Sequence, residues 1–144
     1  MPTIVPREEA IAALEEEWGV LASLFADLGA DDWDRPTACP GWSVKDNLAH
    51  IIGTEAMLLG RPTPDVDVSQ LTHLRNDIAR FNEAWVEHYR SRPADEVVAA
   101  LDDAVAERRA ALAAMDQAAF DAESFTPAGP DTYGRFMQIG RAHV

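Results

Sequence analysis

Apolar residues recur at helical spacing over residues 6–28, which predicts an amphipathic helix near the start of the chain. Pro6 suits the first turn of this helix, and Glu8 and Glu9 suit the positive end of its dipole. Gly29 supplies a natural stop. The positions that share the apolar face are Ile11, Leu14, Trp18, Leu21, Phe25 and Leu28.

A second helix is predicted after a proline- and glycine-containing loop over residues 30–42. Ser43 and Asp46 form a capping-box pattern in which Asp replaces the usual Glu or Gln. Gly60, Pro62 and Pro64 then end the helix. Its broad apolar stripe consists of Val44, Leu48, Ile51, Ile52, Leu58 and Leu59.

Two more amphipathic helices follow. We expect Ser69 to cap the third, which ends near residue 92 because the residue before Pro93 avoids helical geometry. The fourth runs from about residue 95 to 115. The third helix has the stripe Leu71, Leu74, Ile78, Phe81, Trp85 and Tyr89, and the fourth has Val97, Leu101, Val105, Leu112 and Met115.

Residues 120–131 are expected to form a loop, and residues from Tyr133 onward resemble the first turns of another helix. The predicted fold class is therefore all-α, with an up-down four-helix bundle. The chain has 144 residues, 47% of them hydrophobic, which suits one domain with a sizeable core.

Charge and cysteine content narrow the class of protein. The net charge of −13 argues against nucleic acid or an anionic membrane surface as a partner, because both attract clustered Lys and Arg. No apolar stretch is long enough to cross a bilayer, and the first residues do not resemble a signal peptide. Cys39 is the single cysteine, so no internal disulfide can form. We expect a cytoplasmic protein.

Three polar residues fall inside the predicted apolar stripes: Glu55, Asn82 and Arg108. An isolated buried charge is costly, so we predict that Glu55 and Arg108 pair with each other. The alternative is that these long side chains extend along the edge of the bundle to reach water.

The side chains with reactive or ligating chemistry are few. His50, taken alone, is more often a hydrogen-bonded structural histidine than a ligand, whereas His73 is predicted to be exposed and His88 to lie at a stripe edge. Cys39 has no activating base nearby in sequence and is interpreted as a small buried hydrophobe.

One segment resembles a known family. Residues 33–50 combine Trp33, a Pro36-Thr37 step, the turn Pro40-Gly41-Trp42, the capped helix start and His50. This ordered combination resembles the N-terminal metal-binding domain of the mycothiol-dependent maleylpyruvate isomerase family, in the DinB-like superfamily. The loop over residues 126–130 is also similar to that family, so the resemblance extends to Gln138.

The resemblance implies a helical bundle that holds one divalent metal, usually zinc, through three side chains. His50 corresponds to the first ligand, and the other two are expected beyond Gln138. In this family picture, the cosubstrate is mycothiol, a small thiol whose pKa the metal lowers. The thiolate attacks an electrophilic substrate, which gives isomerisation or S-transfer. A source that makes mycothiol, such as an actinobacterium, is implied.

The last six residues, 139–144, spell the translation of a widely used sequencing adapter. We therefore expect a native domain over residues 1–138 and a non-native tail, so His143 is not interpreted as a ligand. With one ligand present, we expect this chain to bind zinc weakly and to be inactive. The alternative functions are a non-catalytic metal-binding bundle and a helical interaction module in which His50 is structural.

Overall fold

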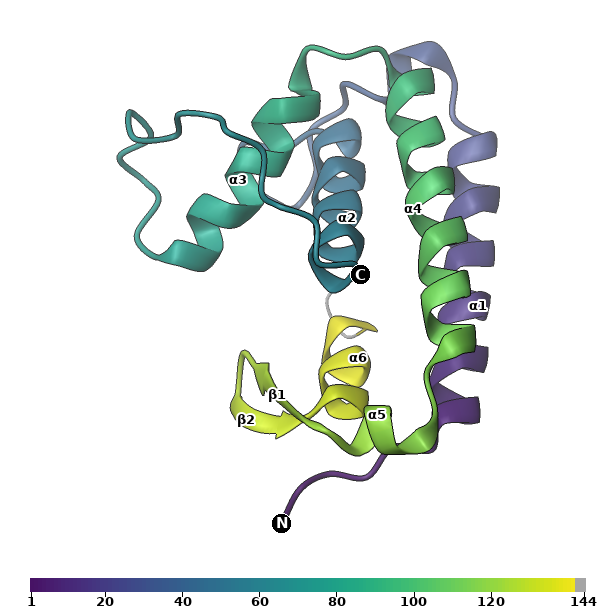
Figure 1. The fold of residues 1–144 in the computed structure, drawn as a ribbon. Coiled ribbons are helices and arrows are strands. Elements are labelled where there is room, and N and C mark those ends of the chain that lie inside the picture. Colours follow the sequence, from purple (N-terminus) through teal and green to yellow (C-terminus); the bar gives the residue numbers. More distant parts are fainter. Residues whose placement is uncertain (142–144) are drawn as a thin grey trace. The chain divides into compact units, whose positions relative to one another are not determined.

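The computed structural model describes residues 1–141, and the side chains of residues 1–138 (Figure 1). His143, in the predicted tail, lies outside the described residues. The chain divides into two compact units, of which the first combines residues 1–26 with the chain from residue 109 onward. The second unit consists of residues 27–108. None of the helices in the described part is both long and apolar enough to cross a membrane.

The first unit contains helix α1 (Arg7–Ala26), the last turns of α4 (Ala94–Ala114) and α5 (Gln117–Asp121). It ends with strands β1 (Glu123–Thr126) and β2 (Gly129–Thr132) and helix α6 (Tyr133–Arg141). Helix α6 packs against α1, α5 and both strands. The predicted face of α1 is confirmed, because its buried residues include Leu14, Trp18, Leu21 and Phe25.

The strands correct the prediction of a loop over residues 120–131 and add a small sheet to the predicted helical fold. They pair antiparallel, with Thr126 opposite Gly129 and Glu123 opposite Thr132. Gly129 adopts a φ of 112°, which favours glycine, and the Thr126 hydroxyl donates to its carbonyl. The fold is therefore mostly helical with one small sheet.

The segment before α1 is tied to this hairpin. The backbone N–H and the hydroxyl of Thr3 donate to the two carboxylate oxygens of Asp131, at 2.7 and 2.8 Å. These hydrogen bonds lower the pKa of Asp131 below its usual value. The first residues of the chain are thus attached to β2, far along the sequence.

The second unit contains a short 3-10 helix (Ala30–Asp32), α2 (Val44–Leu58), α3 (Asp77–Arg90) and the first part of α4. Helices α2 and α3 pack against each other. Gly53 permits this approach, since a Cβ atom there would lie 2.5 Å from Cγ of Trp85. A side chain at position 53 would therefore force the two helices apart.

Helix α3 begins later than predicted. Residues 69–76 lie outside the helix, which starts after Asn76, whose side chain accepts a hydrogen bond from the Ala79 N–H at 2.7 Å. The buried face also differs, because Ile78 is 56% exposed and Glu83 is buried. Asn82, which was predicted inside the stripe, is half-buried, and the buried polar residue of this helix is its neighbour Glu83.

The predicted pairing of Glu55 with Arg108 is confirmed. Arg108 Nε donates to Glu55 Oε2 at 2.8 Å. The side chain of Glu55 is 9% exposed and that of Arg108 is 1% exposed. Both residues belong to the second unit. The charges compensate each other inside the protein, and neither side chain extends to water, as the alternative interpretation required.

Candidate functional site

His50 lies two turns into α2, and the start of that helix is fixed by the predicted capping box. The Asp46 N–H donates to Ser43 Oγ at 3.2 Å, and the Ser43 N–H donates to Asp46 Oδ2 at 2.9 Å. A cap of this kind stabilises a helix by about 1 kcal/mol. His50 itself is half-buried, and its Nδ1 atom is buried. Its backbone position is therefore defined by a well-formed helix.

The loop before α2 brings Trp42 against His50. The two ring centroids are 5.3 Å apart, with the planes tilted by 41°. The loop is closed by Thr37, whose hydroxyl donates to the Trp42 carbonyl at 2.9 Å and whose N–H donates to the same oxygen. Asn47 connects the loop to α2, because its side-chain N–H groups donate to Thr37 Oγ1 and to the Ser43 carbonyl. The imidazole is thus bordered by an indole on a braced loop.

A buried acidic residue of α3 holds the same indole. Trp42 Nε1 donates to Glu83 Oε2 at 2.9 Å, and Arg90 Nη2 donates to the other oxygen, Oε1, at 2.9 Å. Arg90 also lies 3.4 Å from Asp46 Oδ2, so one guanidinium joins α3 to the cap of α2. Hydrogen bonds to a charged group contribute about 1.5–3 kcal/mol each, more than neutral ones.

Three carboxylates surround this single guanidinium. Asp46 and Glu83 are buried. Glu87 is partly exposed and forms an ion pair with Arg90, whose Nε atom lies 3.0 Å from its carboxylate, and Arg90 is 39% exposed. Neither Glu83 nor Arg90 was predicted from the sequence as a site residue. The available signal was their seven-residue spacing, which places both on one helix face. That spacing did not show that the face meets Trp42.

The donors present near His50 bear on the metal that the family resemblance implies. His50 offers one imidazole on a rigid helix, which suits a single ligand. Within residues 1–141, no group of three His, Cys, Asp or Glu side chains is placed to hold a metal ion. The described donors therefore do not form a complete site by themselves, and the assignment of His50 as a ligand stays a prediction.

The remaining candidates lie elsewhere. His73 is exposed, as predicted. Cys39 is also exposed, so its interpretation as a buried hydrophobe was wrong. Its carbonyl accepts the Trp42 N–H, which makes Cys39 the first residue of a tight turn. Connecting turns of this kind run over the protein surface, and the thiol is exposed with the rest of the turn.

His88 belongs to an aromatic cluster near the end of α3. Its ring contacts Tyr89 edge-on, with centroids 4.8 Å apart, and lies 6.3 Å from the Trp85 ring. Burial, followed by the charge of Arg92, lowers the pKa of His88. The cluster packs the helix end, and the prediction of a stripe-edge position agrees with its half-buried state.

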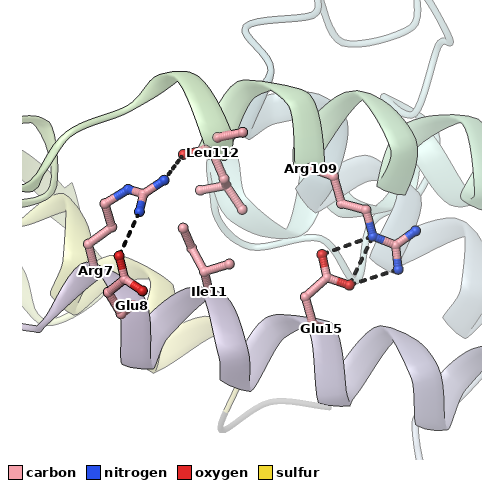
Figure 2. Close-up of a pocket in the computed structure, with 7 residues that line it drawn as sticks. Arg7, Glu8, Ile11, Glu15, Arg109 and Leu112 are labelled. Carbon is pink, nitrogen blue, oxygen red and sulfur yellow. Dashed lines mark hydrogen bonds and ion pairs between the residues drawn. The ribbon is translucent and has the colours of Figure 1, made fainter.

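The first unit contains a cavity of about 240 Å³ beside α1 (Figure 2). Arg7 donates to the carbonyls of Leu112, in the last turn of α4, and of Met115, just beyond the helix end. Arg109 bonds Glu15 through two nitrogen atoms at 2.9 Å. Both guanidinium groups that line the cavity are therefore already bound by protein groups, so neither offers an uncompensated positive charge to a ligand.

Together, these observations define a helical domain whose chemistry-bearing residue is a histidine on a capped helix beside a tryptophan-containing turn. Comparison with known families identifies the kind of domain more closely. The family described as the mycothiol maleylpyruvate isomerase N-terminal domain matches residues 14–143. The chain belongs to this family, which confirms the resemblance found in the sequence.

Relatives among curated proteins give less information. MT0041 and Rv0036c, two uncharacterized proteins of Mycobacterium tuberculosis, are each 33% identical to this chain over 61 residues. The match covers 42% of this chain and spans 24% of the length of each relative. No solved structure matches the chain.

Proposed function

We propose that this domain acts with a divalent metal, zinc, and with the thiol mycothiol in an isomerisation or S-transfer reaction. His50 is proposed as one metal ligand, and an electrophilic small molecule as the substrate. The observation that supports the proposal most is the half-buried imidazole of His50, held on a capped helix beside Trp42 in the segment that carries the family pattern.

The proposed arrangement of the long helices is the up-down bundle expected for this family. Four long amphipathic helices support it, because each has one buried face that must be covered by other elements. The other two ligands of the proposed metal site are expected beyond Gln138, because the described residues contain no group of three donors.

A second candidate is a metal-free helical domain in which His50 is structural. It is favoured by the shortage of donors, since no three ligating side chains converge within residues 1–141. In this case the Trp42–His50 contact would serve packing only. Metal content separates the two candidates.

The test uses the complete protein that the gene encodes, purified without chelators. We expect one equivalent of zinc in the wild type by inductively coupled plasma mass spectrometry, and its loss in His50→Ala, because one of three ligands is removed. His73→Ala is the matched control, since His73 is exposed, and it should retain the metal. Zinc-free wild-type protein, or zinc retained in His50→Ala, would contradict the proposal.

A turnover assay then divides catalysis from plain metal binding. Mycothiol and an electrophile such as maleylpyruvate are supplied to the wild type, His50→Ala and His73→Ala, each purified in the presence of zinc. Thiol-dependent turnover in the wild type and His73→Ala, but not in His50→Ala, is expected. Zinc binding with no thiol-dependent turnover would leave a non-catalytic metal-binding domain.

A further inference from the structure

We infer that Glu83 is a positioning residue that fixes the imidazole of His50 by holding the indole of Trp42. The importance of this arrangement for metal binding rests on the proposed function. The positioning itself does not, because it concerns interactions among residues that are all present in the second unit.

Trp42 is attached to α3 through its indole N–H. An indole has one polar atom, and in Trp42 that atom donates to Glu83 Oε2 at 2.9 Å. Glu83 is 5% exposed, so a rotation of the indole would leave a buried carboxylate oxygen with one hydrogen bond fewer. The ring that borders His50 is therefore held in one orientation.

Glu83 is in turn held by Arg90. The second oxygen of Glu83 accepts from Arg90, and Arg90 also pairs with Asp46, which accepts the N–H of Ser43, the N-cap residue of α2. The network thus runs from α3 to both the loop and the helix that carries His50. A shift of any one member disturbs the bonds of the others, because they share a guanidinium.

Packing alone is the competing explanation, in which Glu83 only neutralises Arg90. Glu87 provides the comparison, because it also pairs with Arg90, at 3.0 Å, whereas the indole N–H of Trp42 donates to Glu83. A substitution of Glu87 removes one carboxylate from Arg90 and leaves the indole attached. An effect produced by substituting Glu83, but not by substituting Glu87, therefore results from loss of the hydrogen bond to the Trp42 indole.

The experiment measures nuclear Overhauser effects between the ring protons of residue 42 and those of His50. The wild type should show them, since the ring centroids are 5.3 Å apart. Glu83→Leu should abolish them, Glu83→Gln should retain them because an amide oxygen still accepts the indole N–H, and Glu87→Gln should retain them. Effects of wild-type strength in a folded Glu83→Leu protein would overturn the inference.

If Glu83→Leu does not fold, Trp42→Phe replaces it. This variant keeps an aromatic ring and lacks the N–H donor, so its ring-to-ring Overhauser effects should be abolished while those of Glu87→Gln persist. Undiminished ring-to-ring effects in Trp42→Phe would overturn the inference.

A metal measurement on the complete protein separates failure of this inference from failure of the proposed function. Zinc affinity should be about tenfold weaker in Glu83→Leu than in Glu87→Gln, as for residues that orient a metal ligand without binding the metal themselves. If Glu83→Leu abolishes the ring-to-ring effects and the wild type binds no zinc, the positioning is supported and the metal is rejected. If the wild type binds zinc, equal zinc affinity in both variants would overturn the importance of Glu83 for metal binding.

Discussion

Arg108 and Glu55 form a buried ion pair whose energetics can be measured directly. Their side chains are 1% and 9% exposed and meet at 2.8 Å. At the 2.8 Å separation and an effective dielectric constant of about 20, Coulomb's law gives an attraction of about 6 kcal/mol. Removing both ions from water costs several kcal/mol each, so the net contribution of the intact pair is small.

The experiment replaces one residue of the ion pair, and then both residues, by apolar ones. Arg108→Met or Glu55→Leu takes the opposite charge of this pair away from a buried ion, which should lower the free energy of unfolding by about 3–5 kcal/mol. That loss is a large fraction of the about 5–15 kcal/mol typical of a domain. The double variant replaces both charges by apolar groups and should lose much less than the two single losses added together.

Urea unfolding followed by circular dichroism gives the four free energies of this double-mutant cycle. Glu107→Gln is a surface control, because Glu107 forms an exposed ion pair with Arg61, and it should change stability by less than about 1 kcal/mol. Two results would refute the compensation of the two charges: a loss below about 1 kcal/mol in both single variants, or single losses that are additive in the double variant.

Two further predictions concern α2 and α3. Gly53→Ala should lower the urea midpoint, because overpacking against Trp85 costs about 1–3 kcal/mol and outweighs the gain of about 1 kcal/mol in helix propensity. His88 should make stability pH-dependent. The pKa of His88 is lowered in the folded state, so the unfolded chain binds more protons as the pH falls. The stability contributed by neutral His88 is complete above the pKa of the unfolded chain, near 6.5. This stability should fall as the pH drops through the lower pKa of the folded protein.

Each of these two has a matched control. Gly19→Ala lies on α1 with open space around the added Cβ and should raise or preserve the urea midpoint; an equal loss at both glycines would contradict the role of Trp85. His88→Gln should flatten the acid limb of the stability profile, whereas His73→Gln, at an exposed position, should leave it unchanged. A profile unaffected by His88→Gln would place the responsible group elsewhere.

Several features were accessible from the sequence because they depend on neighbouring residues. The Ser43–Asp46 cap, the buried faces of α1 and α4, and the family pattern of residues 33–50 were all predicted correctly. The Glu55–Arg108 pair was predicted as well, since burying either charge alone is unfavourable. These inferences required only helical periodicity, local capping and the cost of burying charge.

Other features were decided by the hydrogen bonds and packing of the folded chain. The start of α3 moved to Asp77 because Asn76 caps it, although the apolar spacing continued upstream through Leu71 and Leu74. The hairpin over residues 123–132 formed where turn-type residues predicted a loop, since Thr126 and the positive φ of Gly129 close it. Local composition decided neither where α3 begins nor whether residues 123–132 form a loop or a hairpin.

The sequence by itself determined the mostly helical class, the family and His50 as the residue to examine. Only the tertiary structure decided that Trp42 borders His50 and that Glu83 holds Trp42. The physical reason is that periodicity and capping act over a few residues, whereas the indole and its carboxylate partner are 41 positions apart and meet only when α3 packs against α2.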